Sequence, residues 1–103
     1  MERTPVGIFI RQRLMEVGED YPYRMWKAYC IETERVIPAR SFYVYIYWLK
    51  ELGLIEPSRS SKSKKGFDRV YYRLTPKGMA EESIDLFARP YYYVRLKKAG
   101  AKV

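Results

Sequence analysis

The chain has 103 residues, of which 48% are hydrophobic, with one cysteine, no histidine and a formal net charge of +8. This composition predicts a single folded domain in a reducing, cytoplasmic setting, and it excludes an internal disulfide, a histidine general base and a His/Cys metal cage. No apolar run approaches the roughly 20 residues needed to span a membrane, and the N-terminal residues do not resemble a signal peptide, so no membrane association is expected.

Two helices are predicted in the first third of the chain. The first has Thr4 as its N-cap and Pro5 in its first turn, and apolar residues recur at helical spacing until Gly18 ends it. A loop is predicted at residues 19–22. The second helix is predicted over Tyr23–Thr33, with apolar residues again at helical spacing.

A third helix is predicted from Ser41, a favourable N-cap residue, to about Leu52, and Gly53 is expected to end it. Its apolar face follows the spacing i, i+3, i+4, i+7 and i+10, and consists of Phe42, Tyr45, Ile46, Leu49 and Leu52. The remaining tyrosines of this helix fall largely on other faces.

A β-hairpin is predicted after the third helix. Leu54–Glu56 and Val70–Leu74 are the strand candidates, and Ser58–Asp68 between them has no apolar side chain except Phe67 and contains one glycine. The two segments that flank the tip leave Pro57–Asp68 for it. The sequence therefore predicts a hairpin with a long tip of twelve residues.

A fourth helix is predicted from the N-cap and proline pair Thr75–Pro76 to about Ala88. Its candidate core contacts are Met79, Ile84 and Phe87. Arg89–Pro90 should end it, and Tyr91–Leu96 is either extended or briefly helical. The basic end, Lys97–Val103, is expected to be frayed.

The positive charge is confined to the second part of the sequence. Residues 1–57 carry eight Lys or Arg and eight Asp or Glu, whereas residues 58–103 carry twelve and four. The whole excess of +8 therefore follows the third helix. Such clustering indicates a polyanionic partner, although charge can also serve solubility alone. Nucleic acid fits better than an anionic membrane surface, which would require a basic amphipathic helix, whereas the basic run here is a loop.

Two segments, Ile46–Glu56 (IYWLKELGLIE) and Arg69–Gly78 (RVYYRLTPKG), resemble the winged helix-turn-helix superfamily, especially the MarR-like and PadR-like transcriptional regulators. By this resemblance, the first segment is the end of the recognition helix entering the first wing strand, and the second is the return strand entering the next helix. The resemblance implies an α+β fold with a three-helix core, a two-stranded wing and a C-terminal helix. It divides the chain into a DNA-binding domain, residues 1–90, and an aromatic and basic segment, residues 91–103. Together with the abundance of Tyr, Ile, Lys and Arg, it suggests an archaeal or archaeal-virus source.

The resemblance also implies two sets of DNA-contacting residues. The wing offers cations for phosphates and arginines for a narrow minor groove. Its candidate residues are Arg59, Ser61, Lys62, Lys64, Lys65 and Arg69. The recognition helix would enter the major groove, although its tyrosines and valine replace the side chains that usually read base edges. Its candidate residues are Arg40, Ser41, Tyr43, Val44 and Tyr47.

Double-stranded DNA is therefore the expected partner of a winged-helix regulator of transcription. The alternative is a protein-protein interaction module in a transcription or replication assembly, because Tyr and Trp are enriched at interface hot spots. The fourth helix and the aromatic segment are the candidate surface of a homodimer. The sequence contains no nucleophile-base pair, phosphate-binding glycine loop or metal-ligand spacing, so neither an enzymatic activity nor a cofactor is expected. It identifies no small-molecule effector.

Overall fold

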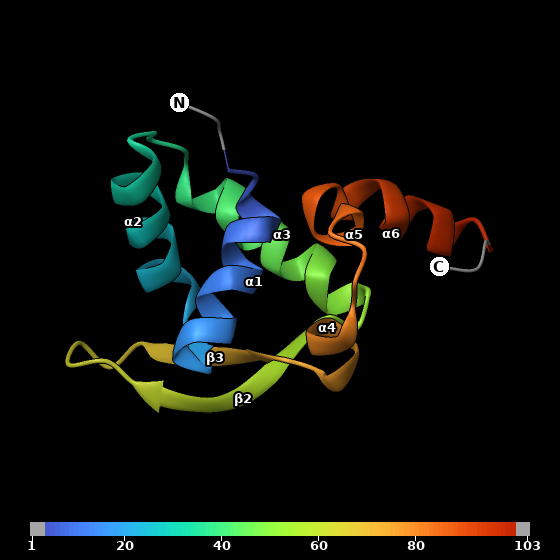
Figure 1. The fold of residues 1–103 in the computed structure, drawn as a ribbon. Helices are drawn as coiled ribbons and strands as arrows, with labels where there is room; N and C mark the ends of the chain where they lie inside the picture. Colours follow the sequence, from blue (N-terminus) through green and yellow to red (C-terminus); the bar gives the residue numbers. More distant parts are fainter. Residues whose placement is uncertain (1–3, 101–103) are drawn as a thin grey trace.

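The computed structural model describes residues 4–100 and has the predicted α+β architecture, in which a layer of helices lies on one side of a small antiparallel sheet (Figure 1). The predicted basic end is therefore described only as far as residue 100. In chain order, the elements are α1 (Val6–Val17), β1 (Glu19–Asp20), α2 (Pro22–Thr33), α3 (Ala39–Glu51), β2 (Ile55–Lys62), β3 (Asp68–Leu74), α4 (Pro76–Ala80), α5 (Asp85–Ala88) and α6 (Pro90–Lys98).

One hydrophobic core joins the helices to the base of the sheet. The predicted inner face of α3 is confirmed except at Tyr45, which is half-buried because it lies at the edge of this face. Gly7 brings α1 against α5 so closely that a Cβ atom there would lie 1.8 Å from the carbonyl oxygen of Phe87. The fully buried side chains include Ile10, Met25, Tyr29, Phe42, Leu49, Leu54, Ile55 and Phe87.

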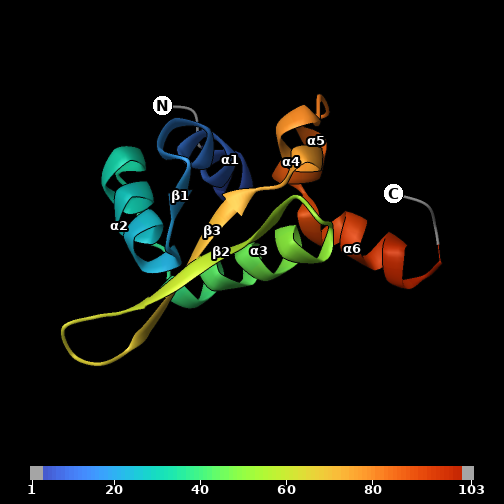
Figure 2. The same ribbon diagram turned by 90° about the horizontal axis from the view of Figure 1, so that it is seen from below.

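The sheet has the strand order β1-β3-β2, and both pairings are antiparallel. β2 and β3 pair from Ile55–Leu74 at the base to Lys62–Asp68 near the tip, with an irregularity after Pro57. The hairpin crosses α3 in the view from below, and its tip and α6 lie at opposite ends of the molecule (Figure 2).

The hairpin differs from the prediction in the length of its tip. β2 extends through Lys62, so most of the predicted tip is paired strand, and the turn comprises residues 63–67. Backbone hydrogen bonds hold this polar stretch in the sheet. The stretch carries no alternation of apolar and polar residues, so side-chain periodicity could not reveal it.

Of the three predicted N-cap residues, two are wrong and one is confirmed. Thr4 and Ser41 are not N-caps, because Pro5 and Pro38 occupy those positions and their carbonyl oxygens accept the first backbone bonds. The extended conformation that proline readily adopts places it directly before the helix. Thr75 does cap α4, since its Oγ1 accepts a 2.9 Å bond from the N–H of Gly78.

The predicted loop at residues 19–22 is also wrong, because Glu19 and Asp20 form β1 and α2 already begins at Pro22. These two residues pair with Arg73 and Tyr72 of β3. A strand of two residues has no periodicity of its own, so only its tertiary partner reveals it.

The predicted fourth helix is divided into α4 and α5. Met79 and Ile84 are exposed rather than part of the core, whereas Phe87 is fully buried as expected. The chain becomes extended at Glu81, whose carboxylate accepts a bond from the N–H of Ser83, so the helix cannot continue. After the predicted break at Arg89, the aromatic segment is helical and forms α6.

Candidate nucleic-acid interface

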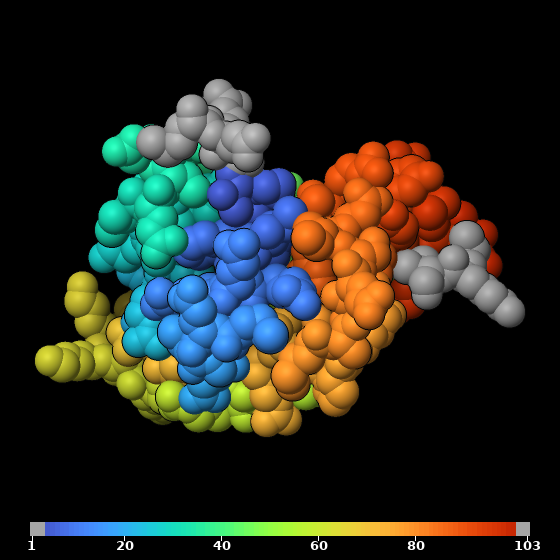
Figure 3. Space-filling model, viewed as in Figure 1, coloured from blue at the N-terminus to red at the C-terminus, as the bar shows by residue number. Residues whose placement is uncertain are grey.

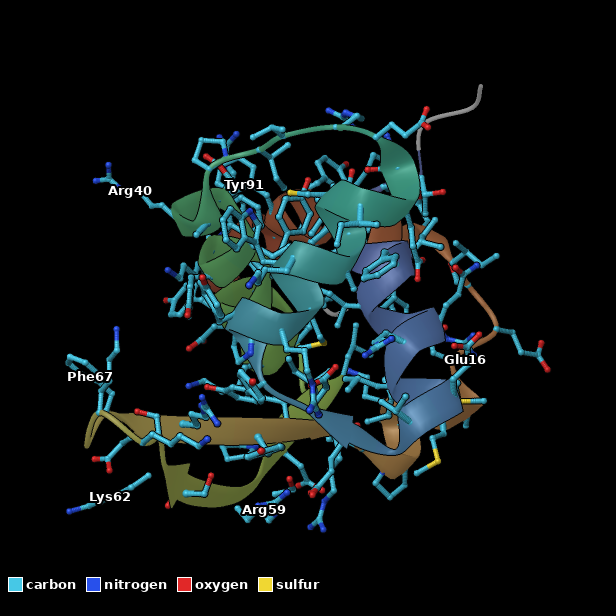
Figure 4. All side chains as sticks on the ribbon, turned by 90° about the vertical axis from the view of Figure 1, so that its left-hand side faces the viewer. Glu16, Arg40, Arg59, Lys62, Phe67 and Tyr91 are labelled. Carbon is cyan, nitrogen blue, oxygen red and sulfur yellow. The ribbon has the colours of Figure 1, made fainter. Side chains whose placement is uncertain are left out.

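The outer face of α3 presents all five residues predicted for the recognition helix. Tyr43, Val44 and Tyr47 are between 37% and 47% exposed, and Arg40 and Ser41 are exposed at the start of the helix. Burial raises the pKa of the Tyr43 hydroxyl, with a smaller contribution from Tyr23. Tyr43 therefore remains a hydrogen-bond donor at neutral pH. Arg40 points away from the body of the molecule (Figure 4).

The tip of the hairpin carries the exposed lysines. Ser63 closes the turn, because its backbone N–H donates to the carbonyl oxygen of Phe67 and its Oγ accepts from the N–H of Phe67. Lys62, Lys64 and Lys65 are exposed around this turn. The tip projects beyond the body of the molecule below α2 (Figure 3). Its cations are thus presented to solvent beside the outer face of α3.

The two arginines of the hairpin contact other protein groups. Arg59 forms an ion pair of 2.5 Å with Glu19, and its guanidinium lies 3.7 Å from the centre of the Tyr71 ring. Arg69 lies 4.8 Å from the centre of the Tyr21 ring. Both predicted minor-groove residues therefore help to attach the hairpin to the segment that contains β1.

The carboxylate of Glu19 connects β1 to β2. It accepts hydrogen bonds from Ser58 and Arg59, which lower the pKa of Glu19 below its ordinary value. Beside it, the fully buried Asp20 accepts bonds from Arg13, Arg24 and the N–H of Tyr21. Ser61, the remaining predicted wing residue, is half-buried and pairs with Arg69 in the sheet.

A groove of about 790 Å³ separates the hairpin from the helices. Its walls are the outer face of α3, the start of α2, β3 and the turn of the hairpin. Four aromatic residues of this surface were not predicted from the sequence, namely Tyr21, Tyr23, Phe67 and Tyr72. They come from three separate segments, and only the frequency of aromatic residues along the chain could have drawn attention to them.

The aromatic segment forms a second surface at the opposite end of the molecule. The ring of Tyr91 of α6 packs against Trp48 of α3 in a tilted arrangement, with ring centres 5.1 Å apart, and Val94 is buried in the common core. Tyr91 and Tyr92 are nonetheless about half exposed. Part of the segment thus packs on its own chain, and part faces solvent.

Neither a metal site nor a membrane span is found among residues 4–100. No group of three or more His, Cys, Asp or Glu side chains is placed to hold a metal ion in this part of the chain. None of its helices is long and apolar enough to cross a membrane.

Similarity to known proteins lies in the fold. The sequence matches no known family model and no curated protein. A protein of Thermoplasma acidophilum assigned as a transcriptional regulator superposes with a TM-score of 0.64 at 20% identity, over 91% of this chain and 84% of that one. A PadR family transcriptional regulator of Eggerthella lenta superposes with a TM-score of 0.60 at 20% sequence identity, over 92% of this chain and 78% of that one.

This chain has the fold of the PadR-like winged-helix regulators. A transcriptional regulator of Clostridium thermocellum also superposes on this chain, with a TM-score of 0.56 at 28% identity over 92% of this chain and 84% of that one. In this PadR-like fold, the β2–β3 hairpin is the wing, and α3 is the helix that was predicted to be the recognition helix. The expected winged-helix architecture is confirmed.

Proposed function

We propose that this protein is a regulator of transcription that binds double-stranded DNA. The observation that carries the proposal is the position of the exposed face of α3 across one groove from Lys64 and Lys65 of the wing turn. Further support comes from the three solved structures, which are described as transcriptional regulators and not as enzymes. This description agrees with the expectation that the chain has no enzymatic activity, and regulation of transcription implies a cytoplasmic location.

In the proposed complex, α3 enters the major groove and the wing lies along the phosphate backbone. Tyr43 and Tyr47 donate hydrogen bonds to phosphates or base acceptors, and Val44 contacts a thymine methyl group. Lys62, Lys64 and Lys65 neutralise phosphates, and Ser61 and the two arginines lie on the paired strands of the wing. Affinity then depends mainly on charge, because few of the α3 side chains read base edges.

The proposed regulator acts as a homodimer. Support comes from Tyr91 and Tyr92, two large side chains that remain half exposed on α6. Two-fold symmetry would present two copies of α3 to a pseudo-palindromic site with half-sites one helical turn, or a multiple of it, apart. Light scattering of the wild type and of Tyr92→Asp tests this point, and a monomeric wild type would contradict it.

Selection of bound sequences from a random duplex pool tests the proposed function. Enrichment of a palindromic motif is the expected result. If no duplex binds even at low salt and a protein partner is captured independently of salt, the alternative role as a protein-protein interaction module in a transcription or replication assembly is correct instead.

A further inference from the structure

The groove between α3 and the wing is lined by an unusual number of aromatic rings. Tyr23, Tyr43 and Tyr47 are each between 43% and 48% exposed, and Phe67 at the turn is 70% exposed. Tyr21 and Tyr72 complete the aromatic lining. The volume of about 790 Å³ lies within the range of roughly 300–1,000 Å³ that is typical of ligand sites.

Cations line the same groove. Lys50 of α3 lies on one wall, with its Nζ 6.0 Å from the centre of the Tyr72 ring, and Lys64, Lys65 and Arg69 lie on the wing side. Asp68 is the single carboxylate among the described residues that line the groove. The groove therefore suits an occupant that is both anionic and rich in flat rings.

Single-stranded nucleic acid has both properties. Its phosphates carry the negative charge, and its unpaired bases offer faces that stack on aromatic side chains whatever the sequence. In a duplex the faces of the bases are covered by neighbouring base pairs. A duplex can therefore place its phosphates beside the lysines of the groove, but it cannot stack its bases on the tyrosine rings. The scarcity of base-reading side chains on α3 is also consistent with a sequence-tolerant partner.

We propose that the groove binds single-stranded nucleic acid, with bases stacked on Tyr43 and Tyr47 and phosphates beside Lys50, Lys64 and Lys65. This activity is distinct from the proposed duplex binding, although both use α3 and the wing. The two partners therefore compete for one protein surface.

Fluorescence anisotropy with an oligothymidylate of about 15 nucleotides tests the proposal, because this probe forms no duplex and about 4–16 nucleotides is a usual site size. A labelled duplex of the same length is measured in parallel. The variant Tyr43→Leu/Tyr47→Leu removes the two rings and keeps apolar bulk, whereas Tyr43→Phe/Tyr47→Phe keeps the rings. Ile31→Ala, which truncates an exposed apolar side chain of α2 outside the groove, is the control.

We expect the wild type, the Phe pair and Ile31→Ala to bind the oligothymidylate with similar affinity. The Leu pair should bind it about tenfold more weakly for each ring lost. Thermal melting checks that each variant is folded, and Tyr47→Leu alone replaces the Leu pair if that variant unfolds. Equal affinity of the Leu and Phe variants would overturn the stacking role of the two rings.

The duplex measurement separates the two proposals. Binding of the duplex without the oligothymidylate overturns the single-strand proposal and leaves the proposed regulator intact. Binding of the oligothymidylate alone overturns duplex recognition and supports the single-strand site. Absence of both interactions overturns both proposals.

Discussion

The arginines and the lysines of the wing use their positive charges differently. On the paired strands, Arg59 is paired with Glu19 and stacked on Tyr71, and Arg69 lies against Tyr21. At the tip, Lys62, Lys64 and Lys65 are exposed around a tight turn. Five cations that are close together in the sequence thus divide into two that hold the hairpin on the body and three that face solvent. Composition alone does not distinguish a structural cation from one available to a ligand.

The largest effect on stability should come from the buried carboxylate of Asp20 in β1, beside the wing. Asp20→Ala leaves Arg13, whose side chain is 24% exposed, without its ion-pair partner, and it removes the acceptor for Arg24. We expect unfolding free energy to fall by about 3 kcal/mol, the lower end of the range for breaking a buried pair. Urea denaturation measures it. Asp68→Ala, at the exposed tip end of β3, is the control and should change little.

The difference between lysines and arginines should appear in the salt dependence of duplex binding. Replacing Lys62, Lys64 and Lys65 by Gln should flatten the slope of log K against log salt by up to about 2.7, since each phosphate contact contributes about 0.9. Thermal stability should remain close to that of the wild type. Anisotropy titrations over a range of salt concentrations measure the slope.

The matched variant Arg59→Gln/Arg69→Gln should show the opposite pattern, with a lower melting temperature and a smaller change in slope. A larger slope change in the arginine variant than in the lysine variant would contradict this division between the arginines and the lysines.

Glu19→Gln tests whether Arg59 is withheld from DNA by its ion pair. The amide is a weaker partner for the guanidinium, so Arg59 becomes available to a phosphate. We expect the salt slope to become steeper by up to about 0.9. Glu56→Gln is a suitable control, because it disrupts another exposed ion pair of the sheet, with Arg73. Identical slopes for the wild type and Glu19→Gln would show that Arg59 is not restrained in this way.

The smallest expected effect is a pH dependence of stability that originates at Glu19. Hydrogen bonds from Ser58 and Arg59 hold its folded-state pKa below the ordinary value of 4.5. Its stabilising contribution is thus complete above about pH 4.5 and is lost as the pH falls through the folded-state pKa. The melting temperatures of the wild type and Glu19→Gln should therefore become equal as the pH falls through this pKa.

Asp85 provides a comparison outside the wing. Hydrogen bonds from Arg89 and Tyr93 lower its pKa also, so Asp85→Asn should remove a separate acid-sensitive contribution. In the Asp85→Asn background, the melting temperatures with and without Glu19→Gln should still become equal in acid. A difference in melting temperature that is the same at every pH would exclude Glu19 as a source of the pH dependence.

The sequence predicted the parts of this protein that depend on local pattern. The apolar spacing from Phe42 to Leu52 identified the inner face of α3, and Gly53, with a positive φ of 73°, ends that helix region as expected. The Thr–Pro pair identified Thr75 as a cap correctly, whereas the same pair at Thr4 gave a wrong cap, because Pro5 itself precedes α1. The predicted recognition-helix residues are also exposed, since a helix that buries one face must present the other.

Only the tertiary structure decided the features that depend on distant partners. β1 exists because Glu19 and Asp20 meet β3, and the aromatic groove exists because α2, α3 and the wing bring separate tyrosines together. The roles of Arg59 and Arg69 were decided in the same way, by partners up to 48 residues away in the chain. Helix caps and periodic faces arise from neighbours in sequence, whereas ion pairs and grooves require the completed fold.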